Sequence, residues 1–379
     1  MTPIRLIHLM MFLPFTCMLA GRMVITLYAL ELGASAFVVG VIAAMNQVFG
    51  LLLAYPVGVI QDRHGARGMF VFGALAGGAG LALPWLFPGM LSLYAASVLL
   101  GLWGVIQVVP VQSLMAVVSP PERVARDLSH LNTLAWLTAV IGPLVAGLAV
   151  DALGHGLASL ALLPLVLATL GAVARWGRLL PRGQRGRGPA AGLGDALRDR
   201  ALRPMFMLSM LVQIAMDLFP FFLPLVGHER GLSASAIGTV TAISAIGAIP
   251  SALILPQLGT RASGMVLLGG SFVLCALSYL LLPLSGGMAL LVAASLVYGL
   301  GIGGAHSLVS LLMFRRAPKE RIGAIMGTRM MLNHVVKVIG PAAFGGLAGA
   351  LGLASAPLAA GGLLGCAGWV LLRRPRRVP

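Results

Sequence analysis

Long, uninterrupted apolar runs dominate the chain and alternate with short polar connections. Runs such as Met90–Val117 and Met265–Leu282 show neither a heptad repeat nor the alternation of a half-buried strand. A helix of about 20 apolar residues spans the hydrocarbon core of a bilayer, whereas helices in soluble cores are shorter and amphipathic. The pattern therefore predicts an all-α integral membrane protein, since a transmembrane barrel would show short alternating strands.

Breaks at charged residues and at Gly and Pro clusters divide the chain into twelve predicted transmembrane helices. They cover residues 6–30, 36–59, 69–87, 91–117, 130–150, 157–177, 204–226, 234–257, 264–284, 288–313, 322–350 and 354–372. Only one connection is long, and it is rich in Gly, Pro and Arg. We therefore expect an N-terminal six-helix bundle (1–177), a cytoplasmic linker (178–203) with a short helix at 194–200, and a C-terminal six-helix bundle (204–379).

Composition agrees with a membrane protein. Charged residues make up 9% of the 379 residues and apolar residues 59%, and the mean hydropathy is +0.99. A soluble domain has roughly 25% charged residues, so this chain could not cover a water-facing surface. The three cysteines lie in apolar runs without paired spacing, which indicates neither a disulfide framework nor a metal cluster.

The formal net charge of +16 is distributed very unevenly between the two sides of the predicted bundle. Twenty-two of the 26 Lys and Arg residues lie on the side of the N-terminus and only Arg230 lies on the opposite side, while Arg22, Arg329 and Lys337 fall within spans. Positive charge concentrates in cytoplasmic loops, so both termini are expected in the cytoplasm. The basic residues then face anionic lipid of the bilayer, and nucleic acid is not an expected partner.

This topology is tested by reporter fusions. We expect fusions at Pro189 and at Arg377 to report the cytoplasm, and a fusion at Gly89 to report the far side, because of the charge asymmetry. A far-side signal at Pro189 would contradict the arrangement of six plus six helices.

The two predicted halves share an internal repeat at an offset of 198 residues. Sliding the chain by this offset brings identical residues together without a gap. The identities are Glu31, Gly33, Ser35, Ala36 and Gly40 with Glu229, Gly231, Ser233, Ala234 and Gly238; Ser97 and Gly101 with Ser295 and Gly299; Pro120, Glu122 and Arg123 with Pro318, Glu320 and Arg321; and Gly142, Pro143 and Gly147 with Gly340, Pro341 and Gly345. Parallel six-helix repeats around a central axis are a transporter architecture.

The connection between the second and third predicted helices carries a distinctive motif. Gly58 is followed by three residues, Asp62-Arg63, one residue, Gly65, one residue and Arg67. This resembles the signature loop of the major facilitator superfamily, and the resemblance extends over the whole chain through helix count, linker and repeat. It implies two six-helix bundles that rock about a substrate site near the bilayer midplane, in a chain that acts as a monomer.

The residue types of this loop suit a conformational gate. Gly58 lets two helices approach, Gly65 permits a tight turn, and Asp62 can cap a nearby helix N-terminus. In the family the loop stabilises one conformation; the plainer alternative is a solvated hairpin with topology arginines. In the second half Thr260 replaces the Asp and only Arg261 remains, so any such gate is asymmetric.

A second motif lies in the fifth predicted helix. Gly142-Pro143 followed by Gly147 resembles a family motif of exporters that exchange substrate for protons, and Gly340-Pro341 repeats its first two residues. Proline removes a backbone hydrogen bond and kinks a helix, while glycines permit close packing, so a kink without directional meaning is the alternative. Ser97 stands where many proton-coupled members carry an arginine, which departs from their usual coupling scheme.

Ionisable residues inside spans cost about 2.5–3.5 kcal/mol each on insertion scales, so they are candidates for function. The seventh predicted helix has Ser209, Gln213 and Asp217, and the eleventh has Arg329, Asn333 and Lys337, each set at i, i+4 and i+8 on one helical face. An ion pair between Asp217 and Lys337 would either hold two helices together or take part in transport. Other candidates are Arg22, which can snorkel to an interface, His306, Asn46 and Gln107.

Within the spans three cations face one carboxylate, and surplus positive charge attracts anions. We therefore expect a secondary transporter of a small anionic or amphipathic organic solute, with export favoured by the resemblance and proton coupling as an option. An importer of organic anions and a non-transporting sensor or scaffold remain alternatives. No enzyme motif and no nucleotide-binding loop occurs, so neither catalysis nor a cofactor or metal is expected. Arginine outnumbers lysine 24 to 2, which favours a bacterial cytoplasmic membrane.

Overall fold

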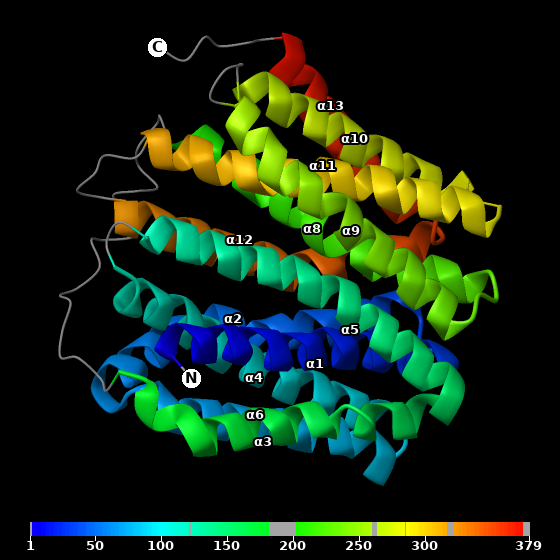
Figure 1. The fold of residues 1–379 in the computed structure, drawn as a ribbon. Helices are drawn as coiled ribbons and strands as arrows, with labels where there is room; N and C mark the ends of the chain where they lie inside the picture. The colour runs from blue at the N-terminus through cyan, green and yellow to red at the C-terminus, as the bar shows by residue number, and fades with distance from the viewer. Residues whose placement is uncertain are drawn as a thin grey trace. The chain divides into compact units, whose positions relative to one another are not determined.

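A computed structural model describes residues 2–120, 123–181, 202–259, 264–284, 286–316 and 322–373. The described residues form twelve α-helices, one short 3₁₀ helix and no strand (Figure 1). The helices are α1 (Pro3–Glu31), α2 (Ala36–His64), α3 (Ala66–Leu86), α4 (Met90–Val118), α5 (Val124–Leu160), α6 (Leu163–Trp176), α8 (Arg203–Glu229), α9 (Ala234–Leu258), α10 (Gly264–Leu284), α11 (Met288–Arg316), α12 (Ile322–Leu351) and α13 (Ser355–Arg373), with the 3₁₀ helix η1 at Gly177–Leu179.

The predicted fold class is confirmed, and most predicted helices agree with the observed ones within a few residues. Among the described helices, eleven are long and apolar enough to cross a membrane. The exception is α6, which has only 14 residues. The chain turns at Gly154, whose φ of 77° is non-helical, and helical structure resumes up to Leu160 before α6 begins. The sixth predicted span is therefore built from two short helical pieces.

The chain forms two compact units. The first comprises Met1–Ser35, Val41–Arg187 and Gly231–Ala242, and the second comprises Ala36–Gly40, Gly188–Arg230 and Ile243–Pro379. The first residues of α2 therefore belong to the second unit, although the rest of α2 is in the first. The first residues of α9 likewise belong to the first unit, although the rest of α9 is in the second. The predicted linker falls largely outside the described residues, as does its short helix at 194–200, and the division at 178–203 stays a prediction.

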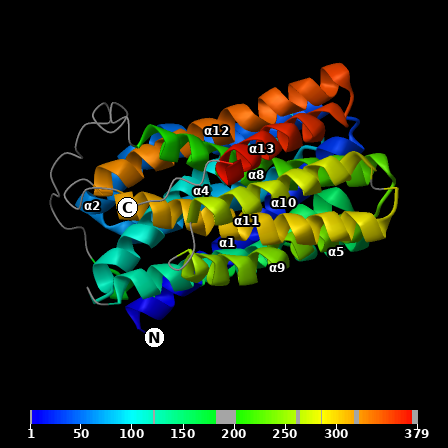
Figure 2. The same cartoon turned by 90° about the horizontal axis from the view of Figure 1, so that it is seen from above.

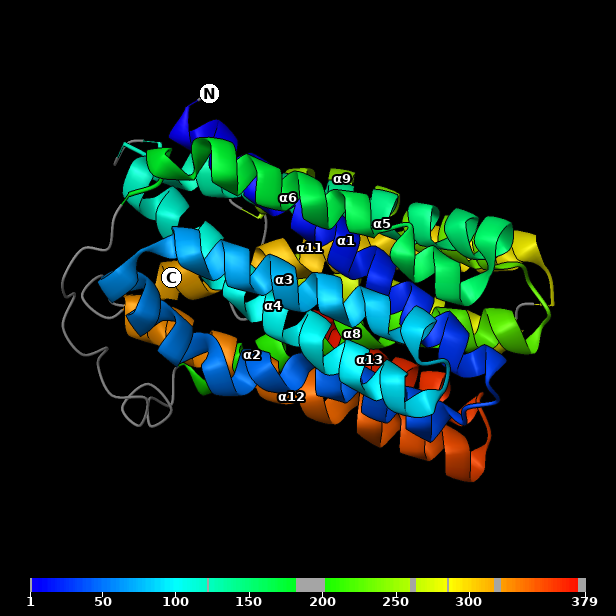
Figure 3. The ribbon, with the colours of Figure 1, turned by 90° about the horizontal axis from the view of Figure 1, so that it is seen from below.

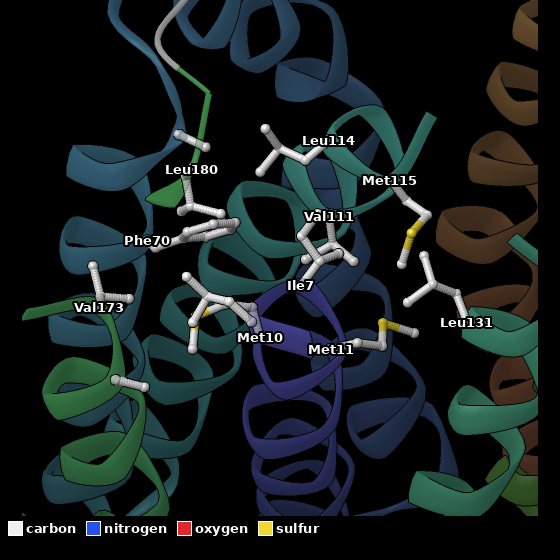
Figure 4. Packing of buried hydrophobic residues seen from close by; sticks show 13 residues of the cluster. Ile7, Met10, Met11, Phe70, Val111, Leu114, Met115, Leu131, Val173 and Leu180 are labelled. Atoms are coloured by element: carbon white, nitrogen blue, oxygen red, sulfur yellow. The ribbon is translucent and has the colours of Figure 1, made fainter. Parts of the chain in front are cut away.

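In the first unit α1 packs along α5 and α4, and α3 packs along α4 (Figure 3). One end of this unit is filled by a buried apolar cluster from several helices, including Met10, Phe70, Val111 and Leu180 (Figure 4). Figure 4 shows Phe70 of α3 beside Leu180, with Met10 of α1 and Val111 of α4 nearby. Close van der Waals packing of these side chains holds α1 within its bundle, because lipid tails are as apolar as the core and provide no hydrophobic driving force between helices.

In the second unit α10 packs along both α13 and α11, and α8 contacts α12 and α11 (Figure 2). An aromatic group lies where α8, α10 and α11 meet. Phe219 stacks on Tyr298 with ring centroids 3.9 Å apart, and Tyr279 meets the edge of Phe219. All three side chains are buried, so this group is part of the core that positions α8.

The internal repeat recurs in a pair of close helix crossings. In the first unit, a Cβ on Gly101 of α4 would overlap the carbonyl oxygen of Asn46 on α2. In the second unit, a Cβ on Gly299 of α11 would overlap the carbonyl oxygen of Ser244 on α9. Each pair of residues is related by the offset of 198. The identity of Gly101 and Gly299 therefore reflects a shared requirement for backbone contact between two helices.

Candidate functional site

The polar face predicted on α8 is present. Gln213 is buried, and its Nε2 donates a hydrogen bond of 2.7 Å to Oδ2 of Asp217, one turn further along the helix. Ser209, one turn earlier, is also buried. This helix thus carries a hydroxyl, an amide and a carboxylate in line, which is the arrangement that the i, i+4, i+8 spacing predicts.

Prolines modify α8 beside Asp217. Pro220 has no N–H, so the carbonyl of Met216 loses its helical donor. The hydroxyl of Tyr298 donates to Met216 O at 3.3 Å and to Ala215 O at 3.0 Å, and the hydroxyl of Tyr279 donates to Ala215 O at 2.8 Å. Tyr298 thereby supplies a donor to the Met216 carbonyl that Pro220 leaves without one, and both tyrosines donate to the neighbouring carbonyl of Ala215. The two tyrosines were not predicted from the sequence. A proline four residues after a buried residue does, however, indicate that the carbonyl of that buried residue lacks its helical donor.

Arg329 is the centre of a hydrogen-bonded group that joins three helices. Its side chain is only 8% exposed. Nε donates to Oγ of Ser209 on α8 and Nη1 donates to Oγ of Ser310 on α11, both at 2.8 Å. Oγ of Ser209 in turn donates to Oδ1 of Asn333 at 3.1 Å. The sequence predicted Arg329 and Asn333 on one face of α12, but Ser310 was missed because a lone serine in an apolar helix carries no signal.

This arginine lacks a counter-ion in the part of the chain that the structure describes. No carboxylate there lies within 4.0 Å of its guanidinium, so its observed side-chain partners are the two serine hydroxyls. A guanidinium has five N–H donors. A buried cation without an acidic partner is costly, and an anion that enters the site would remove that cost.

Lys337 and His306 lie near Arg329. Lys337 is partly buried two turns further along α12, and partly buried His306 on α11 is within electrostatic range of both cations. Among the described residues, Lys337 forms no ion pair with Asp217, whose carboxylate is bound by Gln213 instead. The structure therefore does not contain the direct Asp217–Lys337 pair considered from the sequence, and the two charges are left available for other partners.

The polar candidates of the first unit make contacts between helices. Pro14 leaves the carbonyl of Met10 without a helical donor, and fully buried Gln107 of α4 donates to that carbonyl. Asn46 of α2 is also buried, and its Nδ2 donates to Ser97 O on α4 at 3.1 Å. Both amides thus satisfy backbone groups inside the bundle. Arg22 lies partly buried on α1.

The loop motif is centred on a turn that requires glycine. Gly65 has a φ of 78°, a left-handed conformation, and its N–H donates to Gln61 O at 2.8 Å. Gly58 approaches Val109 of α4, and the stem of Arg67 lies over Gly177 at the end of α6. Arg63 is exposed, and the side chain of Asp62 is outside the described part of the structure.

The Gly-Pro motif places backbone against backbone. A Cβ on Gly142 of α5 would lie 3.2 Å from both the nitrogen of Ala20 and the carbonyl oxygen of Thr16 on α1. Pro143 lies inside α5, and its counterpart Pro341 inside α12 follows buried Gly340. Close helix contact explains why these positions hold glycine.

Comparison with known proteins agrees with this architecture. The chain is 28% identical over 313 residues to the probable actinorhodin transporter of Streptomyces coelicolor. The match covers 79% of this chain and 51% of the relative, so it spans about half the length of that protein.

Solved structures of transporters show the same fold. A POT family transporter in complex with 5-aminolevulinic acid is 13% identical, with a TM-score of 0.81 and coverage of 98% of this chain and 95% of the other. The nucleoside transporter NupG is 14% identical, with a TM-score of 0.76 and full coverage of both chains. The model of the Major Facilitator Superfamily matches residues 9–341. The chain therefore belongs to the major facilitator superfamily and has the multi-pass helical fold of transporters in solved structures.

Proposed function

We propose that this protein exports an anionic or amphipathic organic solute by alternating access, coupled to a proton gradient. The observation that carries the proposal is the buried guanidinium of Arg329, which is joined to serines of two other helices and has no acidic partner in the described structure. Export is favoured by the Gly142-Pro143-Gly147 motif. The relative named as an actinorhodin transporter supports an organic solute as substrate.

In this proposal the anion-binding residues all belong to the second unit. Ser209 and Ser310 hold the guanidinium through Nε and Nη1, which leaves N–H groups for an anionic group of the solute. Lys337 adds a second positive charge on the same helix face. Positioned cations in a site of low dielectric attract an anion strongly, because little water competes for it.

We propose Asp217 as the group that exchanges protons. Gln213 holds one carboxylate oxygen at 2.7 Å, and the carboxylate lies beside the proline-modified part of α8. A solute anion that neutralises Lys337 and Arg329 would withdraw positive charge from the surroundings of Asp217. Proton binding at Asp217 would then depend on whether the site is occupied, so the binding of solute and the binding of a proton would be linked.

The coupling is tested with the Asp217→Asn/Lys337→Gln double variant in inside-out vesicles, with actinorhodin as the first solute. The wild-type protein is expected to accumulate solute when the vesicle interior is acidified. The double variant is expected to fold, but its gradient-driven accumulation of solute should be at least tenfold lower than that of the wild type. Exchange of solute without a gradient should continue. Full gradient-driven accumulation by the double variant would rule out Asp217 as the coupling group.

The membrane and its orientation are also part of the proposal. The excess of arginine over lysine supports a bacterial cytoplasmic membrane, and the charge asymmetry supports cytoplasmic termini. In that orientation the Gly58–Arg67 loop faces the cytoplasm. The reporter fusion at Pro189 decides this orientation directly.

A further inference from the structure

Asp151 makes a polar contact that neither the substrate site nor the loop motif uses. It lies near the end of α5, three residues before the turn at Gly154. Its Oδ1 accepts a hydrogen bond of 3.0 Å from the N–H of Ala234, and its Oδ2 accepts one of 2.9 Å from the N–H of Ser235. Both donors belong to the segment Gly231–Ala242, which contains the first part of α9 and is in the same compact unit as α5.

The two bonds complete the N-terminus of α9. The first amides of a helix have no partner within the helix, and the positive end of its dipole favours a carboxylate. Ser233 accepts from the N–H of Ala236 at 3.2 Å as a local cap. Asp151 satisfies the two preceding amides from a different helix. The start of α9 is therefore bound to α5 through a bidentate, charge-assisted contact.

Close glycine packing accompanies this contact. A Cβ on Gly147 of α5 would overlap the carbonyl of Ala234, and a Cβ on Gly238 of α9 would overlap the carbonyl of Pro143. The two backbones therefore touch over about two turns below Asp151.

The internal repeat provides a comparison without the carboxylate. In the second unit a Cβ on Gly345 of α12 would lie 2.6 Å from Ala36 O, and a Cβ on Gly40 would overlap Pro341 O. This is the same crossing at an offset of 198 residues, between α12 and the start of α2. The counterpart of Asp151 is Gly349. The crossing thus forms without an acid, so packing alone does not require Asp151.

We propose that Asp151 is a latch that holds the start of α9 against α5, at the end of the unit opposite the Gly58–Arg67 loop. Opening at that end requires the carboxylate to release the amides of Ala234 and Ser235. The repeat-related crossing of α12 and α2 opens without such a bond, so the two crossings differ in how tightly they are held. This inference rests on the alternating access in the proposed function.

Hydrogen exchange of the purified full chain tests whether the contact holds the helix start. We expect the amides of residues 234–235 to exchange at least tenfold faster in Asp151→Ala than in the wild type, because they lose their acceptor. Asp151→Asn keeps one carbonyl acceptor and is expected to lie between the two. The amides of residues 36–37, at the repeat-related crossing, are the internal control and should not change. Equal exchange at 234–235 in all three proteins would overturn the latch.

Cysteine labelling tests whether release opens the crossing. Ile237 of α9 is 2% exposed and its repeat counterpart Val39 of α2 is 1% exposed. In a background with Cys366→Ala, labelling of Ile237→Cys by a water-soluble maleimide is expected to become at least tenfold faster when Asp151→Ala or Asp151→Asn is added. Labelling of Val39→Cys should stay unchanged.

The outcomes separate the latch from the proposed function. Faster exchange at 234–235 without faster labelling of Ile237→Cys would show a mere helix cap and would overturn the proposal. Faster labelling supports the latch even if no solute is transported, in which case only the proposed function fails. Equal acceleration at Val39→Cys would indicate general loosening and would also overturn the latch.

Discussion

An Arg329→Met variant is expected to lose most of its affinity for organic anions while folding at least as well as the wild type. Hydrogen bonds to a charged group contribute about 1.5–3 kcal/mol, so the affinity should fall roughly 10- to 100-fold. Methionine has a similar length and no charge. Its introduction removes a buried cation that has no acidic partner in the described structure, so the unfolding midpoint should stay equal or rise.

This effect is measured by thermal unfolding of purified protein against a series of organic anions, zwitterions and cations. A ligand that binds the folded state raises the midpoint with concentration, which gives its affinity. Arg329→Lys is the matched control, since it keeps the charge without the planar fork and should retain part of the affinity. Anion affinity that is the same in Arg329→Met and the wild type would remove Arg329 from the site.

A Gly101→Ala variant is expected to lose stability and, with it, the yield of folded protein. The added methyl would overlap the carbonyl oxygen of Asn46 on α2, and backbone cannot rotate away as a side chain can. Overpacking of this kind costs about 1–3 kcal/mol or more, which exceeds the gain in helix propensity of about 1 kcal/mol. The unfolding midpoint in detergent should therefore fall clearly.

Gly171→Ala is the control for this substitution. It adds the same methyl to α6, where no atom beyond the adjoining residues and backbone of its own helix lies within 4 Å of the new Cβ. Its midpoint should equal that of the wild type or exceed it, because only the helix propensity changes. Equal midpoints for the two variants would show that α2 and α4 are not in backbone contact at Gly101.

Apolar run length was enough to predict nearly all helix boundaries, because crossing a bilayer imposes a minimum length on each helix. The exception was the region between α5 and α6. Residues 151–156 were expected to be a simple connection, but α5 continues to a turn at Gly154 and helix resumes after it. Two glycines around a histidine do not reveal which of them takes the left-handed conformation.

The site was predictable only in part. Spacing of four residues placed Gln213 with Asp217, and Arg329 with Asn333, because such residues share one helical face. Spacing cannot tell which helices face each other, so the bond from Arg329 to Ser310 was not foreseen. Asp151 was missed for the same reason, since its partners in α9 are 83 residues away in the sequence.

Solute exchange in proteoliposomes tests the central claim most directly. Vesicles that contain the purified protein are loaded with an unlabelled anion that stabilises the wild type, and the same anion is added outside in labelled form. A secondary transporter that works by alternating access should accumulate the labelled anion transiently without any nucleotide. At the same anion concentration, vesicles with Arg329→Met should not accumulate it. The account would be contradicted if none of the stabilising anions were exchanged. It would also be contradicted if the protein exchanged cations and the Arg329→Met substitution did not change the rate of that exchange.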